Sequence, residues 1–151
     1  MNIQFDLSIR PTTALSDRQR LEIALLDTRE LRRFAKGKIF LTIDNPRNFM
    51  VIDSEVLDYL DQLKGVIRQI DIGNHKTFTV SGDYFSNSLD FTYTPSSKML
   101  TIYEANGGDF TINLPYRDFK SAFLSFYDQA MTDIQIIYPE LRKNKEFIQM
   151  L

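Results

Sequence analysis

Apolar and polar residues alternate along most of the stretch from residue 74 to residue 114, and this alternation restricts the fold more than any other feature of the sequence. The alternating segments are separated by turn-forming sequences at 95–97 (Pro-Ser-Ser) and 106–108 (Asn-Gly-Gly). Because successive side chains of a strand point to opposite faces, the pattern predicts an antiparallel meander with one buried face and one exposed face.

The turn at 106–108 predicts the register of the last two strands. A three-residue loop sets Ile102 opposite Ile112 and Leu100 opposite Leu114, whereas a two-residue loop would move apolar side chains to the exposed face. We therefore expect the three-residue loop. The exposed face is then expected to carry Asp90, Thr92, Thr101, Tyr103, Thr111 and Asn113.

Two long segments have apolar residues at helical spacing. The first should be capped by Asp53 or Ser54, and its Gly65 should cost about 1 kcal/mol relative to alanine. Its apolar positions are Val56, Leu60, Leu63, Ile67 and Ile70. The second follows Pro115 and is expected to end at Pro139, before a short last helix at 140–150. Its apolar positions are Tyr116, Phe119, Ala122, Phe123, Phe126, Tyr127, Ala130 and Ile134.

The N-terminal third predicts strands around one helix. Residues 2–10 alternate as a half-buried strand. Ser16 and Gln19 have the spacing of a capping box, which predicts a helix over 16–36 that ends at Gly37. Residues 20–25 also alternate, so a strand there is the alternative. The residues after Gly37 predict a strand at 38–44, a turn at 45–48 and a short strand at 49–52.

These elements predict an α+β fold. We expect residues 1–151 to form a single domain in which helices pack on one face of an antiparallel meander sheet of about four to six strands. Pro139 separates the short C-terminal helix from the rest.

Several kinds of chemistry lack the residues they need. The sequence has no cysteine, which excludes disulfides, thiolate catalysis and cysteine-ligated metals. The single histidine, His75, is expected to lie in an exposed loop, and no serine lies in a G-x-S-x-G sequence. Gly107 and Gly108 precede a strand, unlike the glycines of a phosphate-binding loop. We therefore expect no catalytic residue, no metal and no cofactor. A carboxylate-only site near Asp53 or Asp83 remains the alternative.

Charge is distributed unevenly along the chain. The net charge is −2, but residues 1–50 carry nine basic and six acidic groups, and residues 51–110 carry four basic and nine acidic groups. The basic groups include a stripe on the expected first helix, formed by Arg18, Arg29, Arg32, Arg33 and Lys36. The acidic groups of the middle segment are Asp53, Glu55, Asp58, Asp61, Asp71, Asp83, Asp90, Glu104 and Asp109. Helical phasing places Glu55, Asp58 and Asp61 on a solvated face.

Aromatic side chains exceed what a buried sheet face needs. Tyr84 and Phe85 are adjacent, so they cannot both point into the core, and Tyr103 falls on the polar face. Tyrosine beside acidic and hydroxyl side chains is typical of protein-recognition surfaces. The predicted partner-binding residues are Tyr84, Asp90, Tyr103, Glu104 and Asp83.

The absent motifs and the acidic, tyrosine-containing face favour a small non-catalytic protein-binding domain. In its order of strand, helix, meander and helix, the region 38–134 resembles small bacterial toxin-immunity proteins, which implies an inhibitor that masks another, basic protein. One alternative is a small enzyme or ligand-binding domain. Another is a nucleic-acid accessory protein that uses Arg29, Arg32, Arg33 and Lys36, although the acidic balance makes nucleic acid a poorer partner.

The N-terminus has neither the basic segment nor the apolar segment of a signal peptide, and the sequence has no membrane-length apolar run. The expected location is therefore cytoplasmic, without membrane association. An aromatic sheet face also permits a homo-oligomer.

Overall fold

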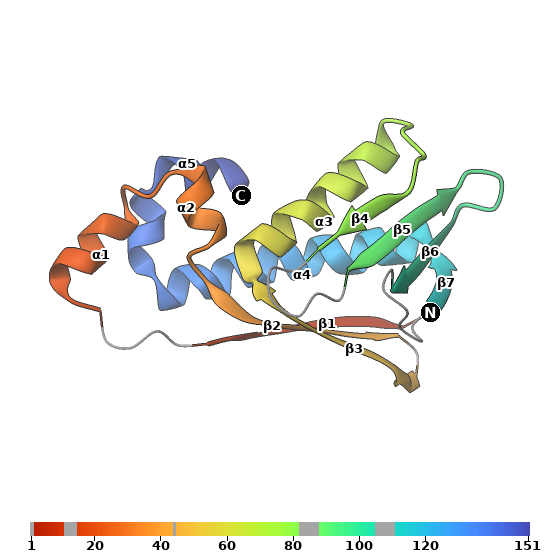
Figure 1. Cartoon of the computed structure of the whole chain (residues 1–151), viewed down its shortest axis with the longest axis horizontal. Helices are drawn as coiled ribbons and strands as arrows, with labels where there is room; N and C mark the ends of the chain where they lie inside the picture. The colour runs from red at the N-terminus through yellow and green to blue at the C-terminus, as the bar shows by residue number, and fades with distance from the viewer. Residues whose placement is uncertain (1, 11–14, 44, 82–87, 105–110) are drawn as a thin grey trace.

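The computed structural model describes residues 2–10, 15–43, 45–81, 88–104 and 111–151 (Figure 1). Its strands form two antiparallel sheets, and the predicted α+β class is confirmed. The first sheet has the order β1 (Ile3–Ile9), β2 (Lys36–Ile43), β3 (Asn45–Glu55). The second is the predicted meander, β4 (Phe78–Val80), β5 (Leu89–Thr94), β6 (Met99–Glu104), β7 (Thr111–Pro115).

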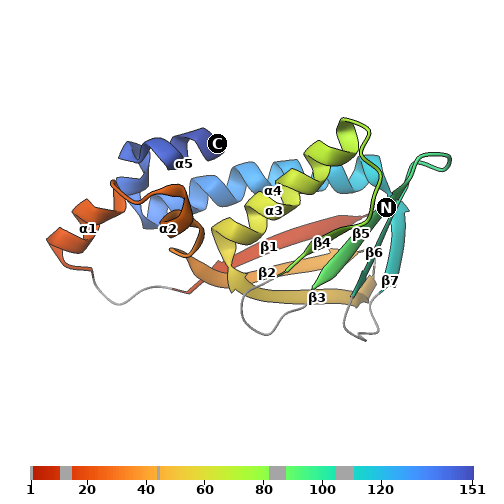
Figure 2. The same cartoon turned by 45° about the horizontal axis from the view of Figure 1, so that its top comes forward.

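Two long helices lie over the first sheet on one side, α3 (Val56–Asp71) and α4 (Tyr116–Ile137) (Figure 2). The short helices gather at the far end of α4, away from the second sheet (Figure 1). They are α1 (Asp17–Ile23), α2 (Thr28–Arg32), the 3-10 helix η1 (Pro139–Lys143) and α5 (Lys145–Met150). The break predicted at Pro139 is confirmed, since the proline opens η1 directly after α4.

The meander has the predicted register. Ile102 pairs with Ile112 and Leu100 pairs with Leu114, and all four lie on the face turned toward the core. The loop at 105–110 lies outside the described residues, so its expected length stays a prediction.

The core joins both sheets through the aromatic rings of α4. Phe5 of β1 lies 5.9 Å from Phe119, 5.8 Å from Phe123 and 5.1 Å from Phe126, measured between ring centroids. Phe119 also lies 5.8 Å from Phe91 of β5. One helix face therefore packs against strands of both sheets. The apolar positions predicted for α3 are likewise all buried.

The single helix predicted over 16–36 is wrong, and so is the alternative strand at 20–25. The capping box at Ser16 is present, but α1 ends at Ile23 and a second capping box, formed by Asp27 and Glu30, starts α2. The second cap satisfies backbone N–H groups that a continuous helix would satisfy internally, so the chain can turn there. Leu21 and Leu25, which the helical stripe would bury or partly bury, are 71% and 82% exposed.

The β2–β3 pairing corrects three further boundaries. Gly37 is not a helix cap but lies in β2 opposite Ser54 and close to β1. Residues 45–48 begin β3 instead of forming a turn, with a register shift between Thr42 and Ile43. Neither Asp53 nor Ser54 caps α3, because both are paired with β2, and the N-cap is Glu55, whose side chain makes no capping hydrogen bond.

Asn144 joins α5 to the segment at the end of α1. Its buried side chain donates through Nδ2 to the carbonyls of Ile23 and Leu26, both at 2.9 Å, and its Oδ1 accepts from the Phe147 amide at 3.0 Å. One amide therefore caps α5 and donates to the carbonyl of the last residue of α1 and to a carbonyl three residues later.

The two glycines at 37 and 65 should respond oppositely to alanine. A Cβ at Gly37 would overlap the Ser8 carbonyl oxygen, so we expect Gly37→Ala to lower the unfolding free energy by about 1–3 kcal/mol. A Cβ at Gly65 meets nothing within 4 Å, so Gly65→Ala should raise it by about 0.5–1 kcal/mol. Urea unfolding measures both. If both variants changed the unfolding free energy in the same direction, the close β1–β2 contact at Gly37 would be contradicted.

Candidate functional site

The outer face of the second sheet carries the polar residues predicted for it. We call it the polar sheet face, and it comprises Thr79, Asp90, Thr92, Thr101, Tyr103, Thr111 and Asn113. These side chains are exposed or half-buried, while the alternate positions of the same strands supply buried core residues such as Phe91 and Ile102. The face therefore results from burial of the opposite side of each strand.

Hydrogen bonds fix the side chains of this face. Thr79 donates through Oγ1 to Asp90 Oδ1 at 2.6 Å, and Tyr103 is the cross-strand partner of Asp90. Thr101 donates to Asn113 Oδ1 at 3.3 Å. The hydrogen bond to the Asp90 carboxylate and its negative charge raise the pKa of Tyr103. Asp90 thus lies between Thr79 of β4 and Tyr103 of β6.

The structure brings together only part of the predicted binding residues. Asp90 and Tyr103 are cross-strand partners. Glu104 pairs with buried Leu89, so alternation places it on the other side of the sheet. Asp83 and Tyr84 lie outside the described residues.

The predicted charged helix faces are not formed as expected. Arg29 and Arg32 lie in α2, Arg33 is its C-cap and Lys36 begins β2, so the basic residues do not share one helix. Glu55 is buried, not solvated. Asp58 and Asp61 are half-buried and accept hydrogen bonds from Gln62 at 2.8 Å and Arg32 at 2.6 Å. Their burial follows from α2 and β4 packing on α3.

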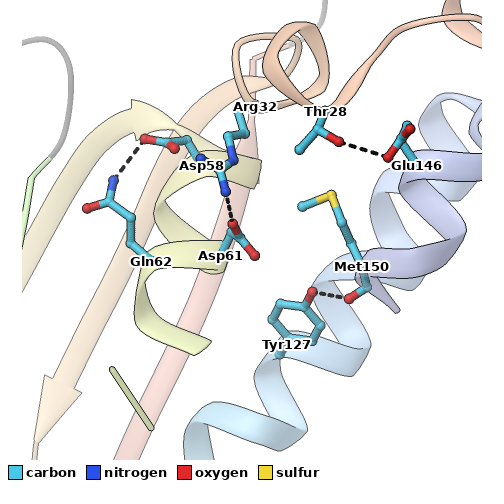
Figure 3. Close-up of polar contacts among 8 residues, drawn as sticks. All are labelled: Thr28, Arg32, Asp58, Asp61, Gln62, Tyr127, Glu146 and Met150. Atoms are coloured by element: carbon cyan, nitrogen blue, oxygen red, sulfur yellow. Dashed lines mark hydrogen bonds and ion pairs between the residues drawn. The ribbon is translucent and has the colours of Figure 1, made fainter. Parts of the chain in front are cut away.

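A groove that the sequence did not predict lies between α2, α3 and α5 (Figure 3). Its volume is about 300 Å³, and charged residues from all three helices line it. Arg32 pairs with Asp61 across α2 and α3, Thr28 donates to Glu146 Oε2 at 2.9 Å, and the Tyr127 hydroxyl donates to the Met150 carbonyl (Figure 3).

Most polar groups of this groove hold the helices together. Lys64 Nζ lies 3.3 Å from the Met150 carbonyl oxygen and 4.3 Å from the centre of the Tyr127 ring. Burial is the largest cause that raises the pKa of Tyr127 to about 12, followed by the charges of Asp61 and Asp128. Tyr127 is therefore a protonated hydrogen-bond donor at neutral pH, and the arrangement serves to attach α5.

Three further observations bear on chemistry. Among the described residues, no group of three histidine, aspartate or glutamate side chains is placed to hold a metal ion. His75 is exposed, with its ring 5.0 Å from that of Tyr93. No helix in the described ranges combines the length and the apolar character needed to cross a membrane.

Comparisons with known proteins identify no relative from which a function could be transferred. No family model, curated protein or solved structure matches the chain. Function is therefore inferred from the geometry of the described residues.

The raised tyrosine pKa values should make the fold sensitive to high pH. The folded pKa of Tyr127, about 12, exceeds the ordinary value near 10, so unfolded chains lose this proton first. The associated stability is present below pH of about 10 and is lost as pH rises toward 12. Burial also raises the pKa of Tyr59 and Tyr116. We expect urea unfolding to show a falling free energy across this range, with a shallower fall in Tyr127→Phe. If the unfolding free energy of Tyr127→Phe fell with pH as steeply as that of the wild type, the contribution assigned to Tyr127 would be contradicted.

Proposed function

We propose that this protein is a small, non-catalytic binding domain that recognises another protein through the polar sheet face. The observation that carries the proposal is the cluster of Thr79, Asp90 and Tyr103 on three neighbouring strands, in which Asp90 accepts a hydrogen bond from Thr79 at 2.6 Å and lies opposite Tyr103. A side chain that is already fixed loses little conformational entropy on binding. Tyrosine in such a position is a frequent source of binding energy at protein interfaces.

The chemistry of the face favours a partner that offers cationic donors. Asp90 is the one acidic residue of the polar sheet face as defined above, and a carboxylate has about four acceptor positions, of which Thr79 occupies one. An arginine of a partner fits the remaining positions and can also lie against the Tyr103 ring.

In its specific form, the proposed role is that of an inhibitor or immunity-type protein, which covers a functional surface of its partner. The resemblance in layout to toxin-immunity proteins and the exposed polar sheet face support this form. A sheet face of this kind masks a partner by steric exclusion, and charge complementarity increases the rate of encounter.

Affinity purification from the native host tests the proposal. The wild-type protein should recover a stoichiometric protein partner, and Tyr103→Ala should weaken its binding about 30-fold, as expected for an interface residue worth about 2 kcal/mol. Tyr103→Phe keeps the ring and should lose less. Gln149→Ala, an exposed change on α5, is the matched control and should bind as wild type.

Thermal melting of each variant separates loss of binding from loss of folding. Recovery of no stoichiometric protein at any salt concentration would refute the proposal. Equal binding by folded Tyr103→Ala would also refute it.

A further inference from the structure

A second hollow, of about 430 Å³, lies at the hairpin end of the second sheet, between the β5–β6 turn and the first residues of α4. Tyr93, Met99 and Tyr116 contribute to its walls, and Lys98 and Arg117 contribute two positive charges. Met99 begins β6, whereas Tyr103 lies near the other end of that strand. The hollow is thus distinct from the Tyr103–Asp90 pair.

Contacts with α3 fix Tyr116, one of the two aromatic side chains of the hollow. The rings of Tyr93 and Tyr116 lie 5.1 Å apart at 60°. The Tyr116 hydroxyl lies 2.8 Å from Asp71 Oδ1 and 3.2 Å from the Ile67 carbonyl oxygen, and the other carboxylate oxygen of Asp71 accepts from Lys120 at 2.7 Å. Because these contacts anchor Tyr116 to α3, the ring surface exists before any ligand arrives.

The two cations are weakly engaged within the protein. In the part of the chain that the structure describes, Lys98 has no ion-pair partner. Arg117 reaches Asp118 only through a contact of 3.9 Å, and its side chain is 93% exposed. Such an exposed pair contributes little free energy, so the guanidinium remains available to an anion.

The backbone at Lys98 adds an independent observation. Lys98 has φ of 56°, which makes it the one non-glycine residue with positive φ in the described ranges. Its amide donates to the Thr94 carbonyl at 2.9 Å, and its carbonyl accepts from the Tyr116 amide at 3.1 Å. A glycine would adopt this conformation without steric strain. The chain instead places a lysine here, beside the hollow.

We propose that this hollow binds a small aromatic anion, meaning an aromatic ring that carries a carboxylate or phosphate group. The ring packs against Tyr93 and Tyr116, and the anionic group lies between Lys98 and Arg117. An aromatic ring on these side chains gains edge-to-face or stacked contacts, and burial of the ring strengthens its attraction to the walls. The two cations select against neutral ligands of the same shape.

Three probes of matched size test this chemistry by NMR chemical-shift titration of the full chain. 1-Naphthoate is the aromatic anion, 1-naphthalenemethanol lacks the charge and decahydronaphthalene-1-carboxylate lacks the aromatic rings. We expect 1-naphthoate to bind with a Kd of about 1 mM or tighter, with shifts around Tyr93 and Tyr116. The other two should bind at least about tenfold more weakly.

Variants then separate charge from fold. Lys98→Gly relieves the positive φ, so its melting temperature should equal or exceed that of wild type while 1-naphthoate binding weakens. Lys98→Gly combined with Arg117→Gln should weaken it at least about tenfold. Arg142→Gln, an exposed change on η1, is the control and should leave binding unchanged. Unchanged binding in the double variant, or equal binding of all three probes, would overturn the proposal. So would the absence of 1-naphthoate binding at about 10 mM.

Discussion

The ring of Phe119 packs against both sheets, and the arrangement of the other elements depends on this contact. Its centroid lies 5.9 Å from Phe5 of β1 and 5.8 Å from Phe91 of β5, and it stacks with Phe123 one turn later at 6.4 Å. Aromatic rings bury more area than other side chains and prefer such edge-on and offset geometries. Because α4 covers one side of the second sheet, the other side is left to polar residues, and Asp90 and Tyr103 meet there.

The sequence predicted correctly those parts of the fold in which only one arrangement of the chain buries all the apolar residues of the pattern. Shifting the β6–β7 register by one residue would expose apolar side chains such as Ile102 or Ile112, so alternation and the expected turn at 106–108 together predicted the observed pairing. The N-terminal helices had no such unique solution. Leu21 and Leu25 fit the spacing of a helical stripe whether or not the helix ends at Ile23. The second capping box, at Asp27 and Glu30, starts a new helix and so divides the segment into two.

The candidate sites divide in the same way. The position of Asp90 and Tyr103 on one face of the sheet, and of Glu104 on the other, follows from strand alternation, whereas the pairing of Asp90 with Tyr103 depends on the β5–β6 register. The groove between α2, α3 and α5 could not be predicted from a local pattern. It joins Thr28 to Glu146 and Lys64 to Met150, which are 118 and 86 residues apart in the sequence. Local sequence patterns carry no information about contacts that helix packing creates. The hollow beside Tyr93 likewise depends on where α4 begins relative to the hairpin, and a lysine at positive φ gave no recognisable pattern.

The buried amide of Asn144 has a consequence for biosynthesis. The carbonyls of Ile23 and Leu26 receive their donor from a residue 121 and 118 positions later. During translation β1, β2 and α3 are synthesised long before that donor, so α1 and α2 leave the ribosome without the side chain that joins them to α5. The helical end of the molecule therefore cannot be completed before α5 has been synthesised, although its first two helices are among the earliest parts of the chain.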